Sequence, residues 1–307
     1  VSFASRMSLL PRSLLPRRSL RLFRRASALG CVRQRCSGSL EYASSCYLPT
    51  TWLDLPLVAK REHNHDSTLY SFGLPEGQAL NLPTCACLLL RVPGTPDDAV
   101  RPYTPISEEA RLGSFDLLVK RYPGGAASQY LHQLALGDTA GFKHVPPNVK
   151  RQYPFGARRI NMLCAGSGVT PMVQALRRLV AEPRDTTEVV LMLGSKSVED
   201  ILMGDELDAL VRAAQGRLRL VHVVGRTAEA GPAQGWRSGA TFTAEAGWID
   251  RAKVEAYCHP PSADTLVFVC GLPAMYEALC GPRTEAGLAE GSLLHRLGYT
   301  AEMCVKM

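Results

Sequence analysis

The sequence lacks a run of 18 consecutive apolar residues and has no CxxC pair. The first absence argues against a bilayer-spanning helix, and the longest apolar stretch, near Leu88, is interrupted by Arg91 and Pro93. The second argues against a zinc ribbon or a redox dithiol, since the ten cysteines and seven histidines are dispersed. We therefore predict no metal site, and cysteines that are mostly small buried hydrophobic residues.

Acidic residues are missing from the first 40 positions, which hold nine Arg and no Lys. The net charge of +7 therefore belongs to this segment, because residues 41–307 contain 26 basic and 28 acidic residues. The rest of the chain offers no general electrostatic case for nucleic acid. We interpret residues 1–46 as a leader and linker. Arg-rich, Ser-rich and acid-poor composition is typical of a mitochondrial transit peptide. A disordered basic tail and a membrane-surface anchor are the alternatives.

The length of 307 residues predicts two domains, each with its own core. Residues 47–150 show short apolar runs broken by Gly and Pro, which predicts an antiparallel β-barrel or sandwich with one helical patch at 128–136. From residue 151 to 307 apolar strands alternate with amphipathic helices, which indicates an α/β domain with a doubly wound parallel sheet.

Two glycine turns in the second domain each lie between a predicted strand and a predicted helix. One is GSGVTP at 166–171, and the other is CGLPAM at 270–275. Ligands of open α/β sheets gather at the carboxyl ends of the strands, and a helix N-terminus there favours phosphate. On its own, GSGVTP is equally consistent with an ordinary strand–helix connection. Cys270 has no basic neighbour in sequence, so a thiolate nucleophile is not indicated.

A third motif, RPYTPIS at 101–107, lies in the first domain. An Arg can pair with phosphate through two hydrogen bonds, and a Tyr ring can stack on a planar heterocycle. Taken singly, each residue is also consistent with a β-edge that contains two prolines.

The order of these motifs is more specific than any one of them. RPYTPIS, then GGAAS at 124–128, then GSGVTP and CGLPAM together resemble the ferredoxin-reductase superfamily of flavoproteins, and within it the NADH–cytochrome b5 reductases. The resemblance covers residues 50–307. It implies an FAD-binding antiparallel β-barrel at 47–150, followed by an NAD(P)-binding α/β domain at 151–307. FAD and NADH are the expected cofactors, with NADPH not excluded.

The resemblance also implies roles for single residues. Arg101 is expected on the FAD pyrophosphate, Tyr103 against the isoalloxazine, and Thr104 near the reactive flavin nitrogen. Thr104 and Cys270 are the expected catalytic positions, with Cys270 bordering the nicotinamide. The expected cofactor-binding residues are Arg101, Pro102, Tyr103, Thr104, Ser107, Leu118, Lys120, Tyr122, Gly125, Ala127, Ser128, Gly166, Gly168, Thr170, Pro171, Gly271 and Met275.

The sequence departs from the family pattern at three places. Ala126–Ala127 replaces the usual Lys–Met pair, Leu272 replaces a Pro, and Gly225–Arg226 stands where an acid is frequent in NADH-preferring relatives. The last departure leaves the choice between NADH and NADPH open. The expected acceptor is cytochrome b5 or a similar haem protein. The alternatives are a related reductase that serves a ferredoxin, a haem-thiolate system or a quinone, and a non-catalytic nucleotide-binding module.

Overall fold

The computed structural model describes residues 46–95, 99–225, 231–234 and 241–307. The predicted leader therefore falls almost wholly outside the described residues. In the part of the chain that is described, no helix combines the length and the apolar character needed to cross a bilayer.

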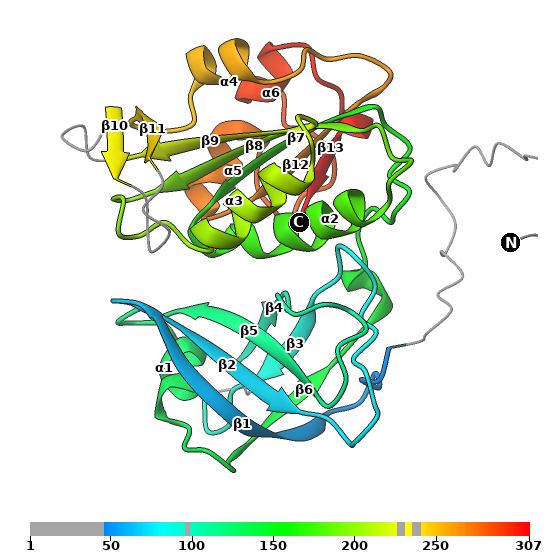
Figure 1. Ribbon diagram of the computed structural model, residues 1–307, viewed down its shortest axis with the longest axis vertical. Coiled ribbons are helices and arrows are strands. Elements are labelled where there is room, and N and C mark those ends of the chain that lie inside the picture. Colours follow the sequence, from blue (N-terminus) through cyan, green and yellow to red (C-terminus); the bar gives the residue numbers. More distant parts are fainter. Residues whose placement is uncertain (1–45, 96–98, 226–230, 235–240) are drawn as a thin grey trace, which may run out of the picture. The chain divides into compact units, whose positions relative to one another are not determined.

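The first half of the described chain forms a six-stranded antiparallel sheet in the order β4-β3-β6-β1-β2-β5 (Figure 1). Three phenylalanines, Phe72, Phe115 and Phe142, pack at its centre with ring centroids 4.6–5.8 Å apart. The elements are β1 (Leu53–Asn64), β2 (Ser67–Gly73), β3 (Leu88–Arg91), β4 (Val100–Tyr103), β5 (Ser114–Lys120), α1 (Ala126–Gln133), β6 (Thr139–Lys143) and the 3-10 turn η1 (Pro146–Asn148). The predicted antiparallel β domain is confirmed.

The second half forms a seven-stranded sheet in the order β10-β11-β9-β8-β7-β12-β13, in which all neighbours are parallel except β10 and β11. The predicted doubly wound parallel sheet is confirmed, with β10 as an antiparallel edge. The strands are β7 (Arg159–Ala165), β8 (Glu188–Ser195), β9 (Leu218–Val224), β10 (Gly231–Gln234), β11 (Thr241–Ala246), β12 (Thr265–Cys270) and β13 (Cys304–Lys306).

Helices cover both faces of this sheet because its strands are apolar on both sides. Met162 of β7 packs in one core with the first two long helices, and Leu163, the next residue, packs in the other core with the last three helices. The helices are η2 (Gly166–Gly168), α2 (Val169–Ala181), α3 (Gly204–Ala213), α4 (Arg251–Tyr257), α5 (Pro273–Leu279), α6 (Leu293–Arg296) and η4 (Ala301–Met303).

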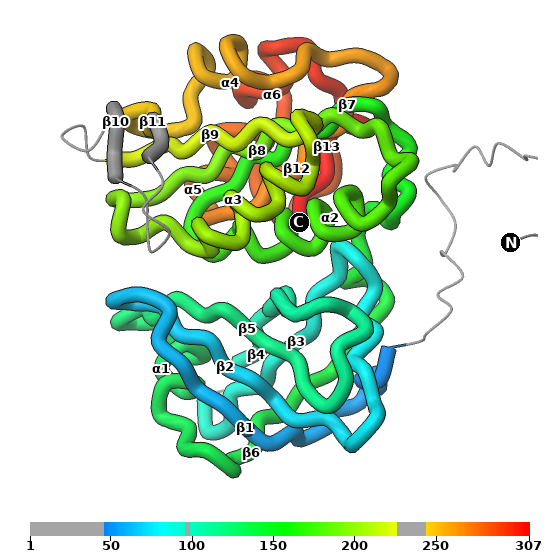
Figure 2. Tube along the Cα trace, in the orientation of Figure 1, coloured from blue at the N-terminus to red at the C-terminus, as the bar shows by residue number. Residues whose placement is uncertain are grey.

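The strand order reverses between β7 and β12. The chain moves from β7 to β8 and β9 on one side and later returns to β12 on the other, so segments about a hundred residues apart lie side by side (Figure 2). Such a switch point opens a crevice at the carboxyl ends of the strands. Both predicted glycine turns, at Gly166–Gly168 and at Gly271, leave these two strands at that end.

Gln174 of α2 ties the second sheet to loops of the first domain. Its side-chain oxygen accepts a hydrogen bond from the Cys85 backbone at 3.1 Å, and its amide nitrogen donates to the Pro105 carbonyl at 3.2 Å. The apolar core beneath α2 also includes Ile106 and Leu118 from the first domain. Because these groups are buried together, the two domains are in apolar contact beneath α2, although the first sheet keeps a separate core of its own.

Candidate active site

A cavity of about 1120 Å³ lies where the strand ends of the two sheets meet. Its wall contains 17 of the 18 residues predicted from the sequence. They are Arg101, Pro102, Tyr103, Thr104, Leu118, Lys120, Tyr122, Gly125, Ala127, Ser128, Gly166, Gly168, Thr170, Pro171, Cys270, Gly271 and Met275. Motifs that are up to 170 residues apart in sequence therefore form one site.

Ser107 is the predicted residue that the fold places elsewhere. It lies in the wall of a second cleft, and its hydroxyl accepts a hydrogen bond from the Asp116 backbone at 3.1 Å. The two preceding residues, Pro105 and Ile106, are buried against the second domain, so the chain has turned away from the cavity before it reaches Ser107.

The edge strand β4 brings Arg101 and Tyr103 to the cavity. Arg101 is exposed, and the hydrogen bond that its guanidinium makes in the described structure goes to the adjacent Val100 carbonyl at 2.9 Å. Since a guanidinium carries five N–H donors, most of its donors remain available. Burial raises the pKa of the Tyr103 phenol well above its usual range, so this side chain is a neutral ring and hydroxyl donor.

The turn before α1 is closed by Ser128. Its hydroxyl accepts from the Tyr122 backbone at 3.1 Å and donates to the Gly125 carbonyl at 3.0 Å. A Cβ on Gly125 would lie 2.6 Å from the Ser128 oxygen and 3.0 Å from the Tyr122 Cβ, so a residue with a side chain does not fit. This cradle leaves the first N–H groups of α1 uncapped by side chains, which suits a phosphate.

On the opposite wall, Gly168 brings the two glycine turns into contact. A Cβ there would lie 2.3 Å from the Cys270 carbonyl oxygen and 3.1 Å from the Gly271 nitrogen. The first residues after β7 form the turn η2, and α2 starts at Val169, so that Pro171 lies in its first turn. Pro171 is tolerated because N–H groups in the first helical turn have no intrahelical partner.

Cys270 ends β12 and is half-buried in the cavity wall. Burial raises the pKa of its thiol, and the Tyr276 hydroxyl and the charge of Arg283 offset only part of that rise. Cys270 therefore remains a thiol near neutral pH, in agreement with the expectation that it is not a nucleophile. Its role beside the nicotinamide stays a prediction.

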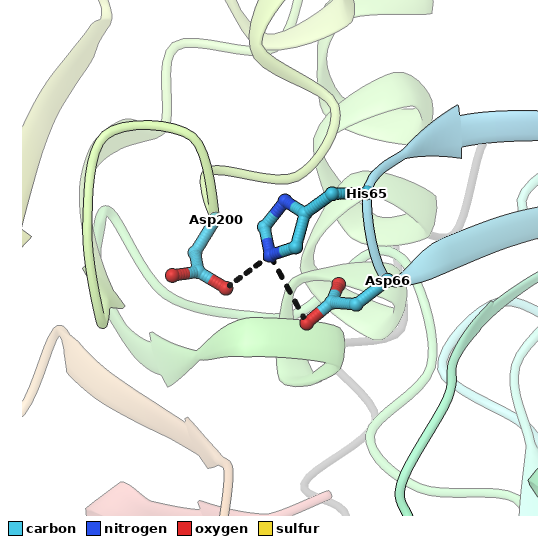
Figure 3. Close-up of side chains that lie close together, drawn as sticks. All are labelled: His65, Asp66 and Asp200. Carbon is cyan, nitrogen blue, oxygen red and sulfur yellow. Dashed lines mark ion pairs between the residues drawn. The ribbon is translucent and has the colours of Figure 1, made fainter.

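Lys120 sits at the end of β5 with two carboxylate partners. Its ammonium lies 2.7 Å from Asp66 and 2.8 Å from Asp200, which follows β8 in the other domain. His65 lies 3.6 Å from the same two carboxylates, and Figure 3 shows its ring between them. Burial works to lower the pKa of Lys120, but these hydrogen bonds outweigh it and raise the pKa. Lys120 thus joins the two domains as well as lining the cavity.

Asp200→Asn should destabilise the folded protein by roughly 1.5 kcal/mol near neutral pH, because a charge-assisted bond to Lys120 is lost. Burial works to raise the pKa of Asp200, but the hydrogen bonds from Lys120 and Ser197 lower it below its ordinary value. The stabilisation is therefore present above about pH 4. It should disappear as pH falls through the folded-state pKa.

Urea unfolding of parent and variant between pH 3 and 7 measures this difference. Glu188→Gln is the control, since Glu188 is exposed and lies 3.9 Å from Arg159, a pair expected to contribute little. A destabilisation by Asp200→Asn that is independent of pH would contradict the assignment of the ion pair.

Several wall residues were not predicted from motifs. Their common feature is position rather than pattern, because each lies on a loop that only the fold brings to the cavity. They include Lys150, Lys196, Trp248, Arg283 and Met307. Trp248 belongs to no motif found in the sequence, although it is 81% exposed and lies in the cavity wall.

The charge of the wall fits two anionic dinucleotides. Among the described residues it holds five cations, Arg101, Lys120, Lys150, Lys196 and Arg283, and one carboxylate, Asp200. Small-molecule sites usually measure roughly 300–1,000 Å³, so this cavity is large. The Gly125 cradle and the crevice at Gly168 each offer helix-start N–H groups to a pyrophosphate. The residues present therefore fit FAD on one side and a nicotinamide dinucleotide on the other.

Comparison with known proteins agrees with this assignment. Residues 54–149 match the oxidoreductase FAD-binding domain, and residues 162–281 match the oxidoreductase NAD-binding domain. The chain is 33% identical over 261 residues to NADH-cytochrome b5 reductase 2 of Scheffersomyces stipitis, with 83% of each chain covered. It is 34% identical over 268 residues to the NADH-cytochrome b5 reductase-like protein of Arabidopsis thaliana, with 84% of this chain and 77% of the relative covered.

Among solved structures, the cytochrome b5 reductase domain of Ulva prolifera nitrate reductase matches with a TM-score of 0.69 at 28% identity, covering 84% of this chain and 98% of that domain. The fold and the site thus define a two-domain oxidoreductase that binds FAD and NADH. The chain belongs to the NADH-cytochrome b5 reductase family.

Proposed function

We propose that this enzyme delivers electrons from NADH, by way of bound FAD, to a one-electron haem acceptor of the cytochrome b5 type. The observation that carries the proposal is the single cavity in which the RPYT edge of the first domain faces the Cys270–Gly271 turn of the second. Relatives named for the reduction of cytochrome b5 support the choice of acceptor.

When bound, FAD would supply the redox chemistry, as the acceptor of a hydride and the donor of single electrons. The protein has to bind and orient the two dinucleotides. Arg101 and the start of α1 supply donors for one pyrophosphate, and the start of α2 supplies them for the other. Cys270, Gly271 and Thr104 border the space between the two sites, where orientation governs the rate.

No side chain of the wall is required as a general base in this scheme. The one carboxylate of the described wall, Asp200, is held by Lys120, and the Cys270 thiol has a raised pKa. The groups of the site therefore serve binding and positioning, as a cofactor-dependent redox enzyme needs.

The test is steady-state turnover of the FAD-loaded enzyme with NADH, first with ferricyanide and then with purified cytochrome b5. Turnover with both acceptors is expected. Reduction of ferricyanide without reduction of cytochrome b5 would overturn the proposed acceptor. A purified protein that releases no flavin on denaturation would overturn the flavoprotein mechanism.

We also propose that the Arg-rich first 40 residues direct the protein to mitochondria, on the basis of their composition. Removing them should leave flavin content and melting temperature unchanged, because a targeting segment adds little to a folded core. A fluorescent fusion of the full chain should localise to mitochondria, and the shortened fusion should not. Identical distributions of the two fusions would contradict the proposal.

A further inference from the structure

The carboxyl ends of β8 and β9 form a part of the cavity wall to which the proposed reaction assigns no contact. Ser195 is the last residue of β8, Lys196 follows it, and Gly225 comes directly after β9; all three line the cavity. The Gly225 backbone donates to the Ser195 carbonyl at 2.9 Å, and a Cβ on Gly225 would lie 3.4 Å from the Lys196 carbonyl. The three residues are thus held together at one edge of the sheet.

This edge is where a doubly wound sheet receives the adenosine ribose of a dinucleotide. In such sheets the second strand of the first βαβ unit ends beside the ribose, and a carboxylate there binds the 2′-hydroxyl and repels a 2′-phosphate. Here β8 is that strand, since it follows β7 through α2 and pairs with it in parallel. It ends in Ser195–Lys196 instead of an acid, and the end of the neighbouring strand β9, where the family resemblance leads one to expect an acid, holds Gly225.

The nearby carboxylates do not face this position as free charges. Asp200 is hydrogen-bonded by Lys120 at 2.8 Å, and Glu199, which lines the second cleft, accepts from the Ser197 hydroxyl at 2.8 Å. Lys196 is exposed, and its ammonium makes no hydrogen bond or ion pair within the described residues. Among the described residues, the charge without a counterion at this corner of the wall is therefore the positive charge of Lys196.

Ser195 adds a polar group that lacks a partner. Its hydroxyl oxygen is buried, with no hydrogen-bond partner in the part of the chain that the structure describes. A buried hydroxyl without a partner is unfavourable, and rotation about a single side-chain torsion can redirect it. A phosphate in the adjacent cavity is an acceptor that would satisfy it.

We propose that Ser195 and Lys196, with the open backbone at Gly225, form a 2′-phosphate subsite, so that the enzyme binds NADPH as well as NADH. The inference rests on the proposed function, because it assumes that the dinucleotide donor occupies this crevice. The Lys196 ammonium supplies the charge, the Ser195 hydroxyl supplies a hydrogen bond, and Gly225 presents no side chain that would exclude the phosphate.

The test uses calorimetric titration of the FAD-loaded protein with 2′,5′-ADP and with 5′-AMP, two probes that differ by the 2′-phosphate. The parent protein should bind 2′,5′-ADP at least as tightly as 5′-AMP. Lys196→Ala should weaken 2′,5′-ADP about tenfold, as expected for one lost charge-assisted contact, and change 5′-AMP by less than about twofold. Arg184→Ala, an exposed cation outside the cavity wall, is the matched control and should change neither.

The outcomes separate this inference from the proposed function. Binding of 5′-AMP that is much tighter than that of 2′,5′-ADP, or equal weakening of both probes by Lys196→Ala, would overturn the subsite and leave the NADH reaction intact. Failure of the parent protein to bind either probe would instead count against the placement of the dinucleotide donor in this crevice.

Discussion

Cys270→Ser should slow the reduction of bound flavin by NADH by up to roughly a hundredfold while leaving flavin content and folding unchanged. Cys270 is the last residue of β12 and lies in the cavity wall. Gly168 is in close contact with the Cys270 carbonyl, and the Tyr276 hydroxyl contacts the Cys270 sulfur. A serine oxygen is smaller and forms stronger hydrogen bonds, so we expect a shift in the wall where the nicotinamide is predicted to lie. A displacement of about one ångström in a reacting group costs on the order of a hundredfold in rate.

Anaerobic stopped-flow mixing with NADH measures this rate directly. Cys258→Ser is the control, because Cys258 is also half-buried but packs against Met192, with its sulfur 3.7 Å from the Met192 sulfur. The control should reduce at the rate of the parent protein. A Cys270→Ser variant that reduces equally fast would show that Cys270 is only a packing residue. A Cys270→Ser variant that loses its flavin would show that Cys270 contributes to FAD binding and that its placement beside the nicotinamide is wrong.

The sequence predicted the order of the fold because its signals are local. Alternating strands and helices with glycine turns after residues 165 and 270 indicate a parallel sheet, and the structure confirms one. The adjacency of β7 and β12 could not be read from spacing, since about a hundred residues separate them. It follows from the switch in strand order, which is a property of the whole sheet.

The same limit applies to the site. The wall residues found by motif lie in short segments with their own turn chemistry, such as the Gly125–Ser128 cradle. Lys120 was predicted as a cavity residue, but its partner Asp200 lies 80 positions away and carries no motif. Ser107 was included because it ends RPYTPIS, yet the buried pair before it turns the chain toward Asp116. Membership of a motif therefore predicts that a residue lies near the cavity better than it predicts which contact its side chain makes.

Arg101→Ala should weaken FAD retention about tenfold or more. A charge-assisted pair between a guanidinium and a phosphate contributes on the order of 1.5–3 kcal/mol, which corresponds to roughly 10- to 150-fold in affinity. Arg101 fits this role because it is exposed on the edge strand β4 and lines the cavity. Within the described residues its guanidinium donates one hydrogen bond, to the Val100 carbonyl. The effect should be large because the usual cation of the α1 turn is replaced here by Ala126, which leaves fewer charges near that turn.

Flavin content after gel filtration, followed by titration of the apoprotein with FAD, measures the effect. Arg61→Ala is the matched control, since Arg61 is an exposed arginine of β1 that lines the second cleft instead of this cavity. The control should keep its flavin. Full occupancy in Arg101→Ala at nanomolar protein would remove Arg101 from the FAD site, and the start of α1 with Lys150 would then have to hold the pyrophosphate.

Loss of flavin together with a lowered melting temperature of the apoprotein would mean that the substitution disturbs β4 rather than a phosphate contact. The assignment therefore requires that the apoproteins of the parent and of Arg101→Ala are equally stable and that the two bind FAD with different affinity.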